Sequence, residues 1–398
     1  MKKRLLRVAT YLLILIMTVT NLPMAFAAPA EYGTLQITQT NPHFAGLETS
    51  LQITQSAPLY FSDGEEPTYY TNPADAAAVI RDAMEARQES FTVGYSVSET
   101  LPEDEAEWNA WFNSIAVDFL MEKAFEETEN ATEGDSLRFS WRSVNLPIKY
   151  TPYSDHTDIL FTYNFTYFAN AAQEAELTAA VDALLEEFAF TAQTTEREKI
   201  DTIYDWLCAN VDYDHDHPDD YNLKFSAYAA MVQRTAVCEG YAVLFYRLAE
   251  EVGLDARVIT GKATHSGENH GWNIVRLDDS YYYLDSTWDA NVAPQDYAYY
   301  LRGASDFEGH INDPEYETAE FRARYPLAAD GVARTELELG DWKIMNVGGR
   351  AIILEYLGND TNVTVPASFD LADYNVPAMA AYDSWNPTFR ADRGEKVS

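Results

Sequence analysis

The chain has 398 residues, with 27 Lys and Arg against 64 Asp and Glu, and its formal net charge is −37. Its 47% hydrophobic and 14% aromatic residues are enough for a large core, which argues against a disordered chain. An acidic excess of this size repels phosphate backbones and anionic lipid headgroups, so the composition excludes nucleic acid as the expected partner.

The first 27 residues are typical of a secretory signal peptide. A basic start, Lys2-Lys3-Arg4, precedes an apolar run from Val8 to Val19 and the small-x-small pattern Ala25-Phe26-Ala27. The run is short for a membrane span of about 20 residues. We therefore expect cleavage after Ala27 and a secreted, extracellular protein with no stable membrane insertion; an uncleaved anchor is the alternative.

Residues 28–192 are expected to form an N-terminal α+β domain with a short β leader. The leader contains two similar segments, Leu35–Gln39 and Leu51–Gln55, with period-2 polarity. Apolar spacing and cap residues then predict further elements in chain order. These are a helix over 74–88, a strand at 91–97, a helix from Pro102 to about 120, strands through 137–141 and 159–167, and a helix over 171–189.

Residues 193–330 are expected to form a second α+β domain, with a boundary near 192. Thr195 and Glu198 have the spacing of a capping box, which predicts a helix that runs to about Asn210. A short helix over about 225–233 follows, then a helix over 238–252 that stops at Gly253. Strands are predicted at 256–262, 270–277 and 281–287, and residues 331–398 are expected to form a small β unit.

The second domain combines residues suited to nucleophilic catalysis. Cys238 starts a predicted helix, where terminal amides and the helix dipole stabilise a thiolate and lower the pKa of the thiol. If Asp278-Asp279 is a two-residue hairpin turn, His270 lies diagonally from Asp285 on one sheet face. A helix bearing Cys238 packed on that face would complete a triad of nucleophile, base and orienting carboxylate.

The segments around these residues resemble the bacterial branch of the transglutaminase-like superfamily. The matching text is Thr235-Ala-Val-Cys238-Glu-Gly-Tyr-Ala242, Gly253-Leu-Asp-Ala-Arg257-Val-Ile-Thr-Gly261, His270-Gly-Trp-Asn273 and Tyr283-Leu-Asp285-Ser-Thr-Trp288-Asp289. The resemblance covers about 195–305 and implies a papain-like core, in which a helix-borne Cys packs on an antiparallel sheet. It also implies a Cys238, His270 and Asp285 triad. Members include cross-linking enzymes, peptide and amide hydrolases, and inactive binding versions.

Several neighbouring residues have more than one interpretation. Cys208 follows Trp206-Leu207 on a helix with no matching base, so we expect it to pack in the core rather than react. One disulfide between the two cysteines is an option that would consume the nucleophile, so we expect both thiols to be free. Trp272 and Trp288 could line a substrate channel or pack in the core. Tyr228 and Gln233, upstream of the thiol, are candidates for an oxyanion contact beside the Cys238 amide.

The acidic loop from Asp212 to Asp220 is rich in carboxylates, as a cation site would be, but its residues do not follow the spacing of a known calcium-binding loop. His217 and Leu223 stand where a calcium-binding EF loop needs Gly and Glu, so a solvated acidic loop is favoured. Zinc held by His215 and His217 is the alternative. We expect no metal and no cofactor. In the tail, Val363-Thr-Val-Pro366 faintly resembles the start of a bacterial leucine-rich repeat.

The sequence thus predicts a secreted thiol-dependent acyl transferase or cysteine protease. It would act on carboxamide or peptide bonds of a protein or peptide partner, with cell-wall association as one option. The alternative is a cell-surface binding or assembly module that keeps the fold without turnover. An intact triad favours the enzyme, because a binding module has no need of it.

Overall fold

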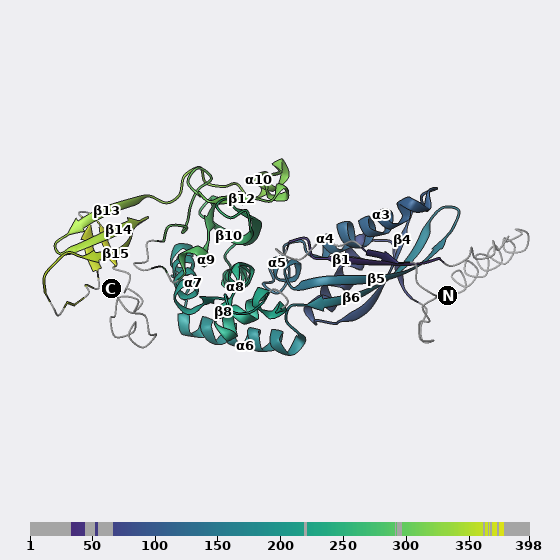
Figure 1. Cartoon of the computed structure of the whole chain (residues 1–398), viewed down its shortest axis with the longest axis horizontal. Helices are drawn as coiled ribbons and strands as arrows, with labels where there is room; N and C mark the ends of the chain where they lie inside the picture. The colour runs from purple at the N-terminus through teal and green to yellow at the C-terminus, as the bar shows by residue number, and fades with distance from the viewer. Residues whose placement is uncertain are drawn as a thin grey trace, which may run out of the picture.

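The computed structural model describes residues 33–43, 52–54, 67–218, 221–290, 292 and 297–360, and parts of the tail at 363–364, 366, 368–371 and 374–377. The expected signal peptide and the loop positions 219 and 220 lie outside the described residues. Three units lie in a row along the longest axis of the molecule (Figure 1). They are an N-terminal sheet with helices, a central mixed unit and a C-terminal sheet, so the fold class is α+β.

The N-terminal unit is built on a six-stranded sheet in the order β2-β1-β5-β6-β4-β3. Its strands are β1(Gly33–Thr40), β2(Gln52–Thr54), β3(Tyr69–Tyr70), β4(Ser90–Val97), β5(Trp141–Pro152) and β6(Thr157–Tyr167). The two leader segments pair with each other, and β1 also pairs with β5 along its whole length. The leader is therefore part of this sheet.

Helices pack against this sheet and enclose one hydrophobic core. They are α2(Pro73–Glu85), α3(Glu105–Ile115), the π-helical turn η1(Ala116–Met121) and α4(Glu122–Ala124). Asn72 caps α2 by accepting a hydrogen bond from the Ala74 amide at 3.0 Å, and Pro73 occupies the first turn, as its fixed backbone favours.

One predicted strand of this unit is wrong. Leu137 lies in the short helix α5(Asp135–Arg138), which Phe139 ends, and the strand β5 begins only at Trp141. The alternating apolar residues mislead here because Leu137 and Phe139 point into two different cores, one on each side of α5.

The central unit combines helices with a four-stranded antiparallel sheet in the order β11-β10-β9-β12. The strands are β9(Ala256–Ala263), β10(Asn269–Leu277), β11(Ser280–Leu284) and β12(His310–Asn312). The helices are α6(Ala171–Phe188), α7(Glu196–Asn210), α8(Cys238–Glu251) and the short α9(Ser286–Asp289). Smaller pieces are β7(Asp212–Tyr213), η2(Asn222–Phe225), η3(Ala229–Gln233), β8(Thr235–Ala236), η4(Pro314–Glu317) and α10(Ala319–Arg324).

The helix α6 packs on the opposite side of the expected boundary. Its buried residues Leu177, Val181 and Leu184 belong to the core of α7 and α8, not to that of the N-terminal sheet. Its position directly after β6 in the chain had favoured the first domain. A division near residue 192 stays a prediction, but α6 is a wall of the central unit.

Local sequence signals set the ends of the central elements. Thr195 and Glu198 form the predicted capping box at the start of α7. After α8, Gly253 takes a φ of 76°, a left-handed conformation that glycine adopts without strain. In the hairpin, Leu277 pairs with Ser280 across the Asp278-Asp279 turn, which is the predicted register.

The C-terminal unit is a sheet of β13(Arg334–Leu339), β14(Trp342–Val347) and β15(Arg350–Tyr356), followed by the pair β16(Ser368–Leu371) and β17(Tyr374–Pro377). It is joined to α7 through Arg350, which forms ion pairs with Asp201 and Asp205. The leucine-rich-repeat similarity at 363–366 falls on positions of which only part is described, between β15 and β16.

A buried ion pair joins the N-terminal and central units. Arg257 on β9 donates two hydrogen bonds to Asp135 on α5, at 2.8 and 2.9 Å, and Asp135 is fully buried. The amide of Val258 donates a third bond to the same carboxylate at 2.8 Å. A paired and fully hydrogen-bonded carboxylate fixes the orientation of the two units.

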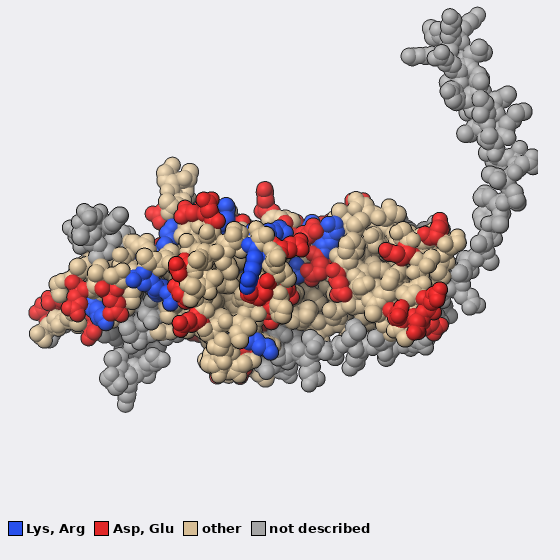
Figure 2. All heavy atoms as spheres, turned by 90° about the horizontal axis from the view of Figure 1, so that it is seen from above, with Lys and Arg blue, Asp and Glu red and all other residues tan. Residues whose placement is uncertain are grey.

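Acidic side chains dominate the surface, as the net charge of −37 requires. On the face seen in Figure 2 acidic side chains occur along the whole length of the molecule, whereas basic side chains lie over its middle and left part and not at its right end. Within the described ranges, no helix is both long enough and apolar enough to cross a bilayer.

Candidate active site

Cys238 is the first residue of α8, directly after the extended residue Val237. The thiol is 5% exposed, and Sγ donates a hydrogen bond to Oε2 of the neighbouring Glu239 at 3.1 Å. The backbone of Gly271, on the adjacent strand β10, also bonds to the sulfur. The helix start and the middle of the sheet therefore meet at this sulfur.

The thiol is protonated in this arrangement, contrary to the expected effect of the helix start. Burial raises the pKa of the Cys238 thiol well above its usual value, and the Glu239 carboxylate raises the pKa further. The Gly271 amide opposes this shift without overcoming it. The expected low pKa of the Cys238 thiol is thus wrong for the resting site, because burial disfavours the thiolate and the adjacent Glu239 carboxylate disfavours it further.

His270 and Asp285 form a close pair on the sheet. His270 Nε2 lies 2.7 Å from Oδ2 of Asp285, as the hairpin register requires. Asp285 caps α9, with Oδ1 accepting from the amides of Thr287 at 2.9 Å and Trp288 at 3.2 Å. The predicted strand over 281–287 therefore ends at Leu284, because Asp285 turns the chain into a helix.

The charges of this pair stabilise each other. Burial alone would lower the pKa of His270, but the charge of Asp285 and its hydrogen bond outweigh burial, so the pKa is raised. Burial alone would raise the pKa of Asp285, yet its bonds and charge interactions with His270 and His310 hold the pKa well below its usual range. Asp285 is therefore ionised, and Nδ1 of His270 is the nitrogen that remains for proton exchange.

A second imidazole binds the same carboxylate, and the sequence analysis missed it. Nε2 of His310 lies 3.1 Å from Oδ2 of Asp285, and its side chain is 1% exposed. His310 reaches the site because β12 pairs with β9, with His310 opposite Ala263. No local pattern in the sequence predicts that pairing, because β12 has only three residues and lies far along the chain.

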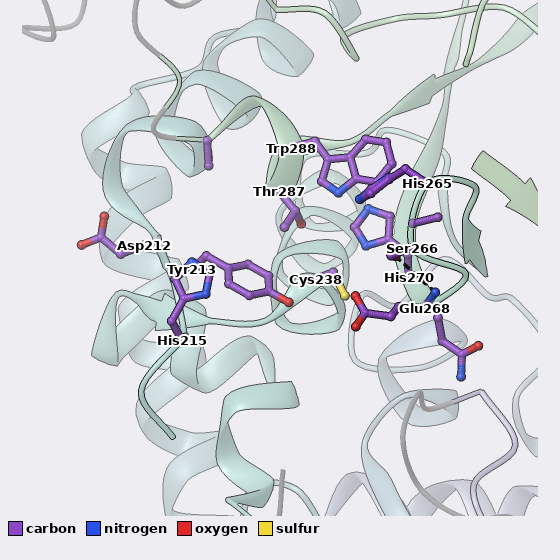
Figure 3. A pocket seen from close by; sticks show the side chains of 13 residues that line it. Asp212, Tyr213, His215, Cys238, His265, Ser266, Glu268, His270, Thr287 and Trp288 are labelled. Atoms are coloured by element: carbon purple, nitrogen blue, oxygen red, sulfur yellow. Dashed lines mark hydrogen bonds between the residues drawn. The ribbon is translucent and has the colours of Figure 1, made fainter. Parts of the chain in front are cut away.

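A cavity of about 520 Å³ opens beside the sulfur. Its wall includes Asp212, Tyr213, His215, Cys238, Ala263, His265, Ser266, Glu268, Asn269, His270, Thr287, Trp288 and Ala290. In Figure 3 the hydroxyl of Tyr213 points toward Cys238, and His270 lies between the sulfur and Trp288. Tyr213 is held there because β7 pairs with β8, which places it opposite Ala236. Neither Tyr213 nor Glu268 is among the site residues expected from the sequence.

Of the four residues proposed for substrate contact, only Trp288 lines this cavity. It stacks on His270 with ring centroids 4.8 Å apart and an interplanar angle of 15°. Trp272 is 1% exposed and packs in a core with Ile259 and Tyr283, so it is not a channel wall.

The two oxyanion candidates lie elsewhere. Tyr228 donates to Glu176 on α6 at 2.8 Å, and Gln233 donates to Tyr221 at 3.3 Å. The sequence placed them near the thiol because they precede it closely in the chain. Gln233 ends η3, and neither residue belongs to the wall of the cavity.

Cys208 lies in the core, as expected. It is buried on α7, and its sulfur contacts the carbonyl of Ser286 at 3.7 Å. Burial raises the pKa of this thiol too, followed by the effect of Asp289. Both cysteines are free.

The two histidines of the acidic loop, His215 and His217, have different surroundings. His217 bonds to Asp214 through Nδ1 at 2.9 Å and stacks on Tyr221, whereas His215 lies in the cavity wall near Tyr213. In the part of the chain that the structure describes, these histidines belong to no group of three ligand side chains within metal-binding reach.

The described residues contain one such group, formed by His270, Asp285 and His310. Their separations are 2.7 and 3.1 Å between imidazole nitrogens and one carboxylate oxygen. Two ligands of a tetrahedral zinc ion lie about 3.3 Å apart, given zinc–ligand bonds of about 2.0 to 2.1 Å. The contacts are therefore hydrogen bonds, and the geometry does not fit a resident ion.

A family model matches the part of the chain that holds this site. Residues 183–286 match the family model of the transglutaminase-like superfamily, and this segment contains Cys238, His270 and Asp285. The kyphoscoliosis peptidase of Homo sapiens is 25% identical over 132 residues, which are 30% of this chain and 20% of that protein. The Mus musculus protein is 23% identical over 133 residues, which are 31% of this chain and 20% of its own length.

The match spans about a fifth of these curated relatives. A crystal structure of a TGase aligns with 50% of this chain and 51% of its own, at 16% identity and a TM-score of 0.26.

Proposed function

We propose that the transglutaminase-like domain at residues 183–286 makes this chain a thiol-dependent acyl-transfer enzyme. Cys238 is the nucleophile, His270 exchanges the proton and Asp285 orients the imidazole. The observation that carries the proposal is that a thiol at a helix start and a carboxylate-bound imidazole line one open cavity.

The first half-reaction acylates the thiol. His270 Nδ1 takes the Cys238 proton, and the thiolate attacks the carbonyl carbon of a carboxamide or peptide group. A carbon–sulfur bond forms while the carbonyl electron pair moves to oxygen. When that pair returns, the carbon–nitrogen bond breaks, and the leaving nitrogen takes the proton from His270.

The second half-reaction releases the acyl group. His270 removes a proton from an amine or from water, and that acceptor attacks the thioester carbon. The carbon–sulfur bond breaks, and the proton on His270 returns to the Cys238 sulfur. Transamidation and hydrolysis differ only in this acceptor.

The oxyanion would form at the mouth of α8. The amides of the first helical turn point toward that position, and the Tyr213 hydroxyl points into the cavity toward Cys238 (Figure 3). Tyr213 thus takes the role that the sequence analysis gave to Tyr228 and Gln233. Export through the predicted signal peptide and a protein or peptide substrate belong to the same proposal.

The resting state of the thiol supports a second candidate function. Because Cys238 rests as a protonated thiol that donates a hydrogen bond to Glu239, the second candidate is a binding module that retains the fold without turnover. The enzyme proposal differs from it in one respect, since His270 must be able to take that proton when a carbonyl group fills the cavity.

The test uses the purified chain with a glutamine-containing protein and a labelled primary amine. We expect release of ammonia from the glutamine carboxamide, with incorporation of the amine when the amine is the acceptor and without it when water is, and we expect neither from Cys238→Ala. Peptide substrates with amide-linked reporters extend the test to hydrolysis. Equal product from the wild type and from Cys238→Ala would sink the enzyme proposal.

A further inference from the structure

We infer that His310 is held as an imidazolium and acts as a positioning residue, fixing Asp285 and opposing the positive charge of His270. The inference rests on the proposed function in taking His270 as the base.

Both ring nitrogens of His310 face atoms that can only accept. Nδ1 lies 3.0 Å from the carbonyl oxygen of Glu308, and a carbonyl has no proton to give. Nε2 lies 3.1 Å from Oδ2 of Asp285, whose carboxylate is ionised. Each nitrogen must therefore donate, and a histidine that donates from both nitrogens carries a positive charge.

The surroundings suit a buried cation. The His310 ring stacks on Phe307 with centroids 3.9 Å apart, and Trp288 and Trp272 lie at 4.2 and 4.7 Å. Aromatic rings at such distances attract cations, and the Asp285 carboxylate supplies the opposite charge. The aromatic rings and the Asp285 carboxylate thus offset the free-energy cost of burying a charged imidazole.

His310 also completes the bonding of Asp285. One carboxylate oxygen accepts from His270 and His310, and the other accepts from the amides of Thr287 and Trp288. With these donors in place, the carboxylate cannot rotate without losing bonds. It therefore holds His270 at a fixed angle to the cavity.

The charge of His310 also sets the proton affinity of His270. The two rings have centroids 5.5 Å apart, so a positive charge on one disfavours a second on the other. Asp285 alone would stabilise a protonated His270 more strongly. His310 offsets part of that stabilisation and keeps His270 able both to accept and to give up a proton.

Other titratable groups face this cluster from each packed element. They are Cys238, Glu239 and Tyr241 on α8, Tyr204 and Cys208 on α7, Asp289 on α9, and Tyr299 and His265 beside the aromatic rings. Burial raises the pKa of Tyr204, Tyr241 and both thiols, so these remain neutral at neutral pH. Glu239 and Asp289 are unchanged in the variants used below.

The first experiment measures the wild-type protein and uses one variant to assign the signal. Nitrogen-15 histidine labelling of the full chain, which has seven histidines, lets NMR count the protons on each ring between pH 6 and 8. We expect one buried imidazole with protons on both nitrogens across this range, and His310→Phe to remove that signal. A His310 ring with a single N–H overturns the inference.

The second experiment separates charge from hydrogen bonding. His310→Gln can place a neutral amide donor near the position of Nε2, whereas His310→Phe keeps the ring shape and loses the donor. Removing a charge at 5.5 Å should raise the midpoint of the His270 NMR titration by about one pH unit or more in both variants. If Gln leaves the midpoint at the wild-type value, His310 acts only as a hydrogen-bond donor and the inference fails.

These readouts are independent of turnover. A protein that shows a doubly protonated His310 but no acyl transfer would contradict the proposed function and leave this assignment intact. An active enzyme with a neutral His310 would support the proposed function and contradict the assignment of His310. A wild-type ring count also remains readable if a variant fails to fold.

Discussion

The two cysteines lie in contrasting regions, one on each side of the comparison between cavity and core. Both regions involve the short helix α9, because its cap Asp285 acts on both thiols and its Ser286 contacts Cys208. Cys238 starts α8 and lines the cavity beside His270, whereas Cys208 lies within α7 against the carbonyl of Ser286. Burial raises the pKa of both thiols, and the charge of Asp285 acts on both. Burial and acidity therefore do not distinguish the two. Only Cys238 has access to a cavity and to an imidazole, and this access is the difference between the two cysteines.

The largest expected effect comes from removing each sulfur in turn. Cys238→Ala should lower amine incorporation or hydrolysis by at least about 10³-fold, because no nucleophile remains. Cys208→Ala should keep turnover within a factor of about three, since surroundings away from the reacting atoms change little. Comparable losses in the two variants would remove the contrast between the regions.

The next effect concerns the carboxylates at either end of α9. Asp285→Asn keeps the Oδ1 cap of α9 but loses the charged partner of His270, so turnover should fall by about two to four orders of magnitude. Asp289→Asn is the matched control, because Asp289 bonds to Tyr204 at 2.6 Å on the Cys208 side. We expect it to lower the unfolding midpoint while turnover is largely kept. Kinetics and thermal unfolding of both variants check this.

Tyr213 tests the cavity wall next to the thiol. Tyr213→Phe removes a hydroxyl that points toward Cys238, and loss of one oxyanion donor costs about 10² to 10³ in turnover in well-studied enzymes. We expect a loss at the lower end of that range in kcat with KM nearly unchanged. Tyr228→Phe, which loses only a bond to Glu176, should behave as the wild type. Equal behaviour of the two variants would remove Tyr213 from the site.

Glu239 offers a test of what sets the pKa of the Cys238 thiol, which lies beside it, and not that of Cys208. Because its carboxylate raises the pKa of Cys238, Glu239→Gln should lower that pKa and increase the thiolate fraction at neutral pH. A fall of one unit corresponds to an increase of about tenfold in the alkylation rate. In the wild type the rate should keep rising with pH beyond the ordinary range of a thiol. Mass spectrometry of alkylated peptides reports Cys238 and Cys208 separately.

Glu251→Gln at the far end of α8 is the control for this measurement, because Glu251 pairs with Arg247 and not with the thiol. An unchanged Cys238 rate in Glu239→Gln would show that the carboxylate does not hold the thiol proton.

The smallest expected effect is a difference in the free energy of unfolding between variants of the two cysteines. Cys208 is enclosed on α7, so Cys208→Ala should reduce the free energy of unfolding by about 1 kcal/mol through a small cavity. Cys238 borders open space, so Cys238→Ala should cost less. Denaturant titrations of both variants measure the difference. A larger loss at Cys238 would mean that the cavity wall is as tightly packed as the core.

Local signals in the sequence predicted what depends on near neighbours. The Asp278-Asp279 turn placed His270 beside Asp285, and the Thr195 capping box started α7. These succeed because a two-residue turn fixes a strand register and a cap satisfies helix amides within one turn. Much of the candidate site follows from such short-range rules.

Features that depend on distant pairing were missed. His310 joins the site through β12, a three-residue strand that pairs with β9 across more than forty intervening residues. Glu239 lies within the sequence motif around Cys238, but the motif does not predict that its carboxylate accepts a hydrogen bond from the thiol. Side-chain orientation in three dimensions decides both, and neither periodicity nor capping patterns contain it.

The buried pair between Arg257 and Asp135 limits how this protein can be divided for recombinant work. Excising the segment that matches the family would discard Asp135, remove the first turns of α6 and omit β12 with His310. The fragment would keep the nucleophile and yet expose a guanidinium and the apolar surface that α5 covers. An autonomous folding unit must therefore begin before α5 and extend past β12, which makes the N-terminal sheet an intramolecular scaffold for the reactive centre.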